Sequence, residues 1–212
     1  PLTSIAGYAE LIETGIAQPK DSPDLARKIH VEASRMIQLV NDILQLSNLD
    51  NVSEAGTPLT METVDLLEVA RECVERQKVN AKRSFISLTY LGESAPVLGS
   101  RSLLDELCQN LCDNAIRYNR PGGKVQIITA CTRDGHCSLT VKDNGIGIPK
   151  EAQSSVFERF YRVDKSRSKA TGGTGLGLAI VKHIARIHNA RIKLESEIGE
   201  GTTITVLFET AH

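Results

Sequence analysis

The first fifty residues carry two apolar stripes with helical spacing, and this pattern limits the fold more than any other feature. Apolar side chains recur every three or four residues, first at Leu2, Ile5, Ala9, Ile12 and Ile16, then at Ile29, Ala33, Met36, Val40 and Ile43. Such spacing is typical of helices packed in coiled-coil fashion. A polar turn over 18–21 separates the stripes, and Ser22 before Pro23 is typical of a helix start. Residues 1–50 are therefore predicted to form a helical hairpin.

The second stripe is wider than one partner helix can cover. Further leucines flank it, namely Leu25, Leu39, Leu44, Leu46 and Leu49. A second copy of the hairpin would supply the missing surface, so we expect a homodimeric four-helix bundle formed through residues 1–50. The alternative is that the hairpin packs on the remainder of the same chain.

The rest of the chain predicts a linker and then a mixed α/β domain, so the expected fold class is α+β. Residues 51–60 are small and polar and include Gly56 and Pro58, which is typical of a linker. Within 61–212, helices are expected from a cap at Asp65 to about residue 83, from a cap at Ser100 to about residue 119, and over 176–188. Alternating runs predict strands over 84–91, 125–131, 137–141, 192–195 and 203–208.

Composition excludes several functions. The chain has 25 Lys and Arg against 26 Asp and Glu, a formal net charge of −1, so nucleic-acid binding through overall basicity is not expected. No apolar run approaches the roughly 18 residues of a membrane span, and no signal peptide opens the chain, so a soluble cytoplasmic region is expected.

The cysteines form neither a dense disulfide framework nor a paired C-x-x-C metal set. Cys108 and Cys112 are interpreted as buried small hydrophobes. Cys131 and Cys137 flank Asp134-Gly135, a hairpin signal, and would face each other across two strands. A disulfide between these two is left open.

The helix expected to start after Ser100 presents polar groups on one face. Asn110, Asn114 and Arg117 are spaced four and three residues apart, and Tyr118 flanks them. Two amide oxygens one turn apart can help to hold a hydrated Mg²⁺ that takes its other ligands from phosphate. Taken alone, this spacing is equally typical of a solvated helix face.

Asp143-Asn-Gly145-Ile-Gly147 follows the second hairpin strand. An acidic residue there can accept a hydrogen bond from an exocyclic amine, and the glycines let the backbone approach a flat ring. Residues 158–169 then hold two acidic residues against five cations, Arg159, Arg162, Lys165, Arg167 and Lys169. This run suits a polyphosphate, and its lack of hydrophobic periodicity predicts a mobile lid.

Gly173-Thr-Gly175-Leu-Gly177 opens the next helix, where free backbone N–H groups and the helix dipole favour an anion. The run is neither a Walker A loop nor a Rossmann fingerprint. Gly199-Glu-Gly201-Thr202 supplies a further tight turn with a hydroxyl group.

Taken in order, these motifs resemble the N, G1, F, G2 and G3 boxes of bacterial sensor histidine kinases, whose superfamily includes DNA gyrase, the Hsp90 chaperones and MutL. The F box corresponds to Phe157-x-x-Phe160. The resemblance implies an α/β sandwich that binds ATP and Mg²⁺. It implies that Asp143 binds the adenine amine with Thr202 in support, and that Asn110 and Asn114 hold Mg²⁺. It places Arg117 and Tyr118 on phosphate or ribose, and the lid cations, such as Arg162 and Lys165, with Gly173–Gly177 around the triphosphate.

The hairpin resembles the dimerisation and phosphotransfer domain of the same family, and Pro1-Leu-Thr-Ser-Ile resembles the end of its H box, His-Glu-Leu-Arg/Lys-Thr-Pro-Leu. The phosphoacceptor histidine would then lie immediately upstream of Pro1, and so would any membrane attachment. The five histidines of the chain match no H box and are interpreted as structural or solvated. The chain as given is therefore expected to bind nucleotide but not to phosphorylate itself.

The implied reaction is transfer of the ATP γ-phosphoryl group to an imidazole nitrogen, then to an aspartate of a response-regulator receiver domain. A neutral imidazole is already nucleophilic, so positioning and charge neutralisation carry most of the catalysis. Hydrolytic relatives have a water-activating glutamate where this chain has Asn110, and an amide cannot act as a general base. A GHKL-type ATPase or anti-sigma serine kinase, and a nucleotide-binding module without kinase activity, remain as alternatives.

Overall fold

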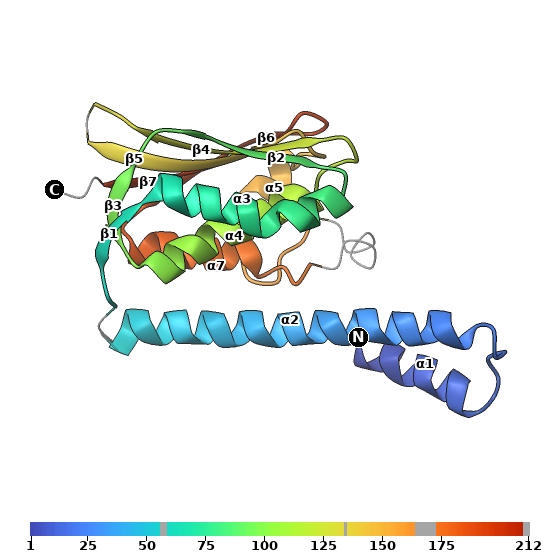
Figure 1. The fold of residues 1–212 in the computed structure, drawn as a ribbon. Helices are drawn as coiled ribbons and strands as arrows, with labels where there is room; N and C mark the ends of the chain where they lie inside the picture. The colour runs from blue at the N-terminus through green and yellow to red at the C-terminus, as the bar shows by residue number, and fades with distance from the viewer. Residues whose placement is uncertain (56–58, 134, 164–172, 210–212) are drawn as a thin grey trace.

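The N-terminal helices form an antiparallel hairpin, as the two apolar stripes predict (Figure 1). This computed structural model describes residues 1–55, 59–133, 135–163 and 173–209. Helix α1 spans Leu2–Glu13 and α2 spans Ser22–Ala55. None of the helices in these described ranges is both long enough and apolar enough to cross a bilayer.

Helix α2 continues into the segment that composition assigned to a linker. It ends at Ala55 rather than near residue 50. Each Asn or Ser destabilises a helix by at most about 0.7 kcal/mol relative to Ala. These residues therefore do not end a helix that is already formed. After Pro23 in the first turn of α2, the next glycine is Gly56 and the next proline is Pro58. The predicted start of the linker is therefore about five residues too early.

A five-stranded sheet forms one layer of the second domain, with strand order β2-β4-β5-β7-β6. Strands β2 and β4 are parallel, and the other neighbours are antiparallel. Every second residue of β4 and β5 is buried, because alternate side chains face the helices. The strands of this sheet span Ser87–Gly92 (β2), Lys124–Cys131 (β4), His136–Asp143 (β5), Arg191–Glu197 (β6) and Gly201–Glu209 (β7).

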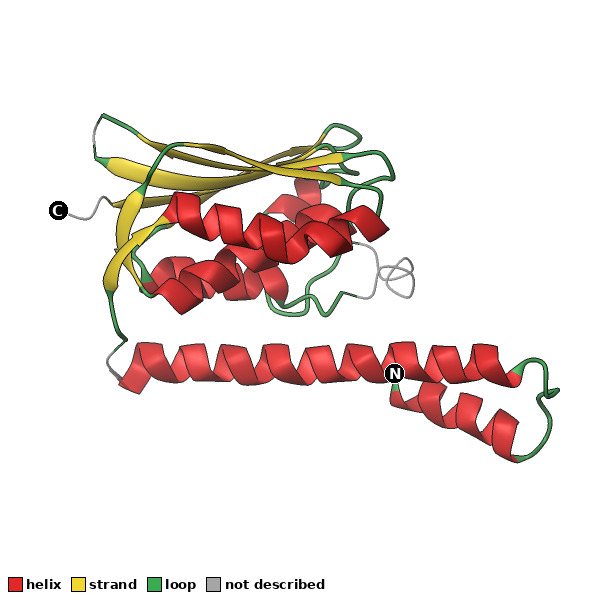
Figure 2. Ribbon diagram, in the orientation of Figure 1, coloured by secondary structure: helices red, strands yellow, loops and turns green. Residues whose placement is uncertain are grey.

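Helices form the second layer, on one face of the sheet (Figure 2). These are α3 (Leu66–Arg83), α4 (Arg101–Arg117) and α7 (Gly177–Ile187), with a short α5 (Lys150–Gln153) at one end. The core between the layers is almost entirely aliphatic, as expected for a chain without tryptophan. The α/β sandwich predicted for this part of the chain is confirmed.

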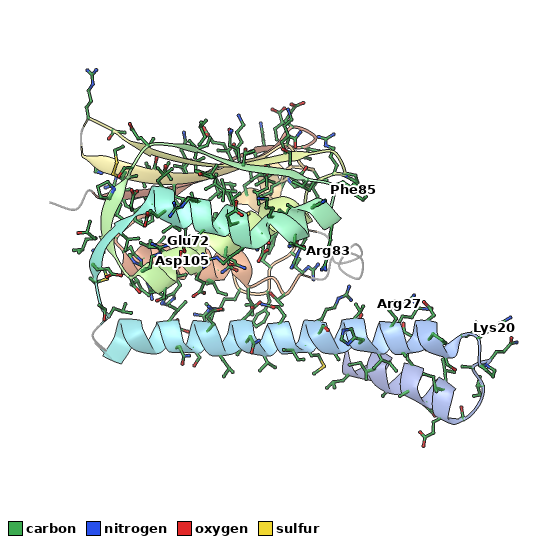
Figure 3. All side chains as sticks on the ribbon, in the orientation of Figure 1. Lys20, Arg27, Glu72, Arg83, Phe85 and Asp105 are labelled. Atoms are coloured by element: carbon green, nitrogen blue, oxygen red, sulfur yellow. A yellow bond between two sulfur atoms is a disulfide. The ribbon has the colours of Figure 1, made fainter. Side chains whose placement is uncertain are left out.

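Side-chain contacts fix helix α4 against its two neighbours. Arg101 bridges Glu72 on α3 at 2.8 Å and Asp105 on α4 at 3.3 Å, and the two carboxylates lie close together in Figure 3. At the same end, the buried ring of His188 accepts a hydrogen bond from the Ser100 N–H at 3.0 Å through Nε2. Its Nδ1 lies 2.8 Å from the Ile184 carbonyl oxygen. The beginning of α4 is thus attached to the end of α7.

Two short strands were missed by the sequence analysis. Strand β1 (Glu62–Asp65) pairs antiparallel with β3 (Pro96–Gly99), and each has only four residues. The strand expected over 84–91 starts at Ser87 instead. Ser84 follows the end of α3, and exposed Phe85 has a φ of 58°, so the chain turns there before it extends (Figure 3).

The cysteines lie where the sequence analysis placed them. Cys131 and Cys137 face each other in the register of β4 and β5 and form a disulfide, with 4.0 Å between their Cα atoms. Cys108 and Cys112 are buried and free, as is Cys73.

Part of the wide apolar stripe of α2 packs on the second domain of the same chain. Leu46 and Leu49 are buried in the common core, and Leu39 packs against it. Helix α2 runs along the helical layer and contacts α7 (Figure 1). The alternative partner for the stripe, the remainder of the same chain, is thus correct for these leucines. Other members of the stripe stay exposed, among them Val40, Ile43 and Leu44.

Candidate functional site

A cavity of about 640 Å³ lies between α4, the loop after β5, the start of α7 and one face of α2. This volume is within the range of small-molecule sites. The predicted site residues that line it are Asn110, Asn114, Arg117, Tyr118, Asp143, Gly147, Arg162, Gly173, Gly175, Gly177 and Thr202. Gly145 lies directly behind this wall, in contact with Tyr118 and Asp143. Lys165 lies outside the described residues, as does the rest of the predicted lid from residue 164 to 169. Motifs spread over about ninety residues therefore share one cavity.

Asp143 ends strand β5 at one end of the cavity. Its Oδ1 accepts hydrogen bonds from the N–H groups of Gly145 at 2.7 Å and Thr202 at 3.3 Å. Burial raises the pKa of this carboxyl, although both N–H groups favour the ionised form. Among the described residues, Oδ2 forms no hydrogen bond. One oxygen is therefore held by the protein, and the other is left to accept from a ligand.

Backbone packs tightly against Asp143 because Gly145 and Gly147 lack side chains. A Cβ on Gly145 would overlap the Tyr118 carbonyl oxygen and lie 2.8 Å from Asp143 Oδ1. A Cβ on Gly147, whose φ is +71°, would overlap the Glu197 carbonyl group. Both glycines are thus required by the close approach of the protein's own backbone. The approach of a flat ring, which the sequence pattern predicts, stays a prediction.

Arg120 holds the loops around Asp143 and was missed by the sequence analysis. Its Nε donates to the Asn144 carbonyl oxygen at 3.1 Å, and its Nη2 donates to the Gly145 carbonyl oxygen at 3.2 Å and to that of Gly199. The guanidinium group therefore joins the loop after β5 to the turn between β6 and β7. The local sequence, an arginine before Pro121, gave no signal of this role.

Ser196 makes a second connection between the same loops. Its hydroxyl oxygen accepts from the Ile148 N–H at 2.8 Å and lies 2.9 Å from Thr202 Oγ1. Gln153 on α5 donates to the carbonyl oxygens of Ile148 and Ser196, each at 2.9 Å. The Thr202 side chain is thus fixed at the edge of the cavity by protein contacts.

The asparagines of α4 lie toward the other end of the cavity. Asn110 Nδ2 donates to the Glu106 carbonyl oxygen one turn earlier, at 3.1 Å. This contact orients Asn110 Oδ1 toward the start of α7, where a Cβ on Gly177 would lie 3.0 Å from it. Asn114 Nδ2 would lie 3.5 Å from the same Cβ. Glycine therefore leaves room between the amides and the first turn of α7.

Arg117 and Tyr118 lie between these two ends, beside Gly173. A Cβ on Gly173 would lie 2.8 Å from Arg117 Nη1 and 3.2 Å from the Tyr118 hydroxyl oxygen. Arg162 donates to the Gly173 carbonyl oxygen. Two arginines and a phenol are thus gathered at the start of the glycine-rich turn, where they increase the positive potential for an anion.

Helix α2 supplies a wall of the cavity that the sequence analysis did not predict. Gln38 and Asp42 line it together with Asn110. Asp42 is 7% exposed, and its Oδ2 accepts from Thr174 Oγ1 at 2.6 Å while its Oδ1 accepts from Gln38 Nε2 at 2.7 Å. The available signal was a row of polar residues four and three apart, completed by Gln45, within a helix otherwise interpreted as an apolar seam.

Glu106 lies one turn before Asn110, between α4 and α2. Its buried Oε1 has no hydrogen-bond partner among the described residues. Burial raises the pKa of Glu106 to about 7, against a hydrogen bond from Gln45 that lowers it, and Asp42 adds to the rise. This carboxyl does not line the cavity.

Both parts of the chain match family models. Residues 99–212 match histidine kinase-, DNA gyrase B- and HSP90-like ATPases, and residues 1–52 match the His Kinase A phospho-acceptor domain. The sensor-like histidine kinase SenX3 of Mycolicibacterium smegmatis is 40% identical over 210 residues, which cover 97% of this chain. The chain spans 53% of the length of that relative.

Solved structures agree with these matches. The mycobacterial sensor histidine kinase MprB is 32% identical, with a TM-score of 0.61 over 71% of this chain and 97% of that structure. The Acinetobacter baumannii histidine kinase AdeS, at 23% identity, shares the fold over the whole of this chain and 96% of its own, with a TM-score of 0.77. The chain therefore belongs to the sensor histidine kinases, within the superfamily of histidine kinase-, DNA gyrase B- and HSP90-like ATPases.

Proposed function

We propose that this chain binds Mg²⁺-ATP and transfers the γ-phosphoryl group to a histidine upstream of Pro1, from which it passes to an aspartate of a response regulator. One observation carries the proposal: a single cavity joins Asp143, the two asparagines of α4 and the glycine-rich turn before α7. Family membership of both parts of the chain supports it.

The Asp143 end of the cavity suits an adenine base. The Oδ2 atom can accept from the exocyclic amine, and Ile146 and Ile198 offer apolar surface for the ring faces. Thr202 is fixed beside the carboxylate by Ser196. We infer that Arg120 keeps both loops at the correct separation for the base.

The other end suits Mg²⁺ and phosphate. Because Asn110 Nδ2 is bound to its own helix, Asn110 presents its oxygen, the atom type that Mg²⁺ prefers. Asn110 and Asn114 would hold the ion, which supplies charge neutralisation for the phosphates when bound. Arg117, Tyr118, Arg162 and the N–H groups of Gly173–Gly177 would contact the phosphates, and Lys165 would join them from the lid.

The identity of residue 110 favours transfer to an imidazole over hydrolysis. An amide cannot remove a proton from water, so Asn110 cannot replace the glutamate of the hydrolytic relatives. In this proposal the chain contributes no nucleophile of its own, and its task is to bind and orient the nucleotide. This region is expected to work in the cytoplasm, with any membrane attachment upstream of Pro1.

A second copy of the chain is the proposed partner of residues 1–50. Val40 is 50% exposed and Leu44 57% exposed, one turn apart on α2, although the leucines facing the second domain are buried. A homodimer would cover this face. Light scattering should give twice the 23.1 kDa of the chain, and Leu44→Glu should shift the mass towards one copy. A wild-type monomer would contradict the dimer.

Calorimetry on the 212-residue chain tests nucleotide binding. Asp143→Asn should reduce ATP affinity at least about tenfold, because the amide presents a donor to the adenine amine. Asp105→Asn is the matched control: its carboxylate pairs with Arg76 and Arg101 away from the cavity lining, and the variant should bind as the wild type does. Unchanged affinity in the Asp143 variant would contradict the assignment of the base site.

Labelled ATP tests the kinase reaction on a chain extended upstream through the H box. Acid-labile phosphate on a histidine is the expected result, and Asp143→Asn should abolish it. Release of free phosphate without protein labelling would instead favour the ATPase, and binding without either product would favour the non-enzymatic module.

A further inference from the structure

The two ends of the cavity have different electrostatic character. At one end, beside Asp143, the Tyr118 carbonyl oxygen accepts a hydrogen bond from the Ile146 N–H. Asn110, Thr174 and Asp42 line the cavity near the start of α7, at the other end. The eight helical steps from Asn110 to Tyr118, at the end of α4, correspond to about 12 Å along the helix axis. A nucleotide with its base on Asp143 therefore points its outermost phosphate toward Asp42. The proposed function sets this direction, and the inference rests on it.

Asp42 brings negative charge to the phosphate end. Its carboxylate is almost completely buried, and both of its hydrogen bonds come from neutral groups, Thr174 and Gln38. Within the described ranges it forms no ion pair. Burial raises the pKa of the nearby Asp113 and Glu106 carboxyls, and the charge of Asp42 adds to the rise in both. A further anion placed here is repelled at short range.

The position of Asp42 depends on how α2 packs against the second domain, the part of the chain that contains the five-stranded sheet. Beyond Asp42, the same helix is held by buried Leu46 and by Asp50, which pairs with Arg159 at 2.8 Å. His183 on α7 is 7% exposed, and its Nε2 lies 3.0 Å from the Leu49 carbonyl oxygen. These contacts place the carboxylate in the cavity, so releasing α2 would remove it.

We propose that Asp42 is a specificity-determining residue of the phosphate subsite: with α2 packed as in this structure, its carboxylate opposes a γ-phosphate, so the cavity prefers a nucleoside diphosphate to a triphosphate. The β-phosphate, one position nearer to Arg117, is affected less because repulsion falls with distance. The packed conformation is thus suited to the product ADP, and ATP binding favours release of α2. The two events are coupled and reciprocal.

Calorimetry with Mg²⁺-ATP and Mg²⁺-ADP tests this assignment on the intact chain. Asp42→Asn keeps the shape and a hydrogen-bond acceptor for Thr174 but removes the charge. It should increase ATP affinity about tenfold, within the usual range of couplings between sites, and ADP affinity about twofold or less. Asp24→Asn, the same change on an exposed part of α2, should alter neither affinity.

Asp50→Lys provides a second test that leaves Asp42 in place. The new lysine places a positive charge beside Arg159 and His183, so α2 should detach more readily from the second domain. The variant should therefore also increase ATP affinity more than ADP affinity. Thermal unfolding monitors whether both variants fold. The ratio of the two affinities is the readout, because a general loosening of the structure changes both together.

Three results would overturn the inference. Weaker ATP binding by Asp42→Asn would mean that the carboxylate helps to hold Mg²⁺. Equal increases in affinity for ATP and ADP, or no change in either affinity, would show that Asp42 does not discriminate between a triphosphate and a diphosphate. Nucleotide binding itself would remain intact. If the wild-type chain binds neither nucleotide, the proposed function itself fails, and this outcome is distinct from an unchanged ratio.

Discussion

Arg159 donates two hydrogen bonds of 2.8 Å to the two carboxylate oxygens of Asp50, although 109 residues separate them in sequence. The Nδ1 atom of His183 lies 3.4 Å from the same carboxylate. One acidic side chain near the end of α2 thus contacts two separate segments of the second domain, the loop with Arg159 and helix α7. Both contacts come from a single guanidinium nitrogen, Nη2, so the pair is a partly exposed ion pair without the two-nitrogen fork geometry.

Reversing the charge of Asp50 should separate the hairpin from the catalytic domain. Asp50→Lys faces Arg159 with a like charge and removes the acceptor beside His183. We expect a larger radius of gyration by small-angle X-ray scattering. Asp24→Lys, which disrupts only local pairs with Arg27 and Lys28, is the control. Identical scattering from the Asp50 variant and the wild type would show that apolar contacts alone hold α2.

Glu106 should make stability depend on pH. Its ordinary pKa is 4.5 and burial raises it to about 7, so the folded chain keeps a proton that the unfolded chain loses in this interval. The contribution of Glu106 to the free energy of unfolding is therefore greatest below about pH 4.5. It decreases as the pH rises to about 7 and does not change further above that pH. Glu106→Gln should be more stable than the wild type by roughly 1–2 kcal/mol at pH 8, because the side chain is only partly buried.

Urea denaturation at pH 4.5 and pH 8 measures this effect. The two proteins should be nearly equal in stability at the lower pH, where both side chains are neutral. Glu75→Gln, an exposed residue on α3, serves as the control. A difference between Glu106→Gln and the wild type that is the same at both pH values would rule out titration of Glu106 as its cause.

Arg120→Ala should weaken nucleotide binding without touching the nucleotide. The change releases three carbonyl oxygens in the loops beside Asp143. We expect a loss of about 1–2 kcal/mol of stability and a fall in ATP affinity of roughly three- to tenfold. Arg120→Lys should not restore binding fully, because an ammonium group lacks the planar fork. Arg71→Ala, at an exposed position on α3, is the control. Wild-type ATP affinity in Arg120→Ala would refute a role of Arg120 in positioning the loops.

Gly145→Ala should destabilise the domain and block the base site. The new Cβ would overlap the Tyr118 carbonyl oxygen, which is backbone and cannot rotate away. A cost of about 1–3 kcal/mol is expected from such overpacking. In contrast, Gly7 on α1 has no atom within 4 Å of an added Cβ, so Gly7→Ala should be neutral or stabilising by up to about 1 kcal/mol. Chemical denaturation compares the two, and equal effects would contradict the steric argument.

Local chemistry explains how much of this fold is predictable from sequence. Asp65 was expected to cap a helix, and its Oδ1 accepts from the Leu67 N–H at 3.0 Å. Asp134-Gly135 was expected to join two strands, and Cys131 does pair with Cys137 across that hairpin. Such signals act within a few residues and need no knowledge of the tertiary structure.

The missed features depend on contacts between distant parts of the chain. Strand β3 contains Pro96 and Gly99 within four residues, so only its pairing with β1 identifies it as a strand. Asp42 belongs to a row of polar residues on α2, and only its contact with Thr174, 132 residues away, shows that this row faces the cavity. Arg120 gives no signal because its partners are backbone carbonyl groups, which any residue could supply.

The ring of His188, held between the Ser100 N–H and the Ile184 carbonyl oxygen, has a mechanical consequence. It fastens the first residue before α4 to the last turn of α7, so the helix with the asparagines and the helix that follows the glycine-rich turn move as one rigid block. In the proposed kinase reaction, we therefore expect the two helices to approach the phosphoryl acceptor together, without rearrangement between them.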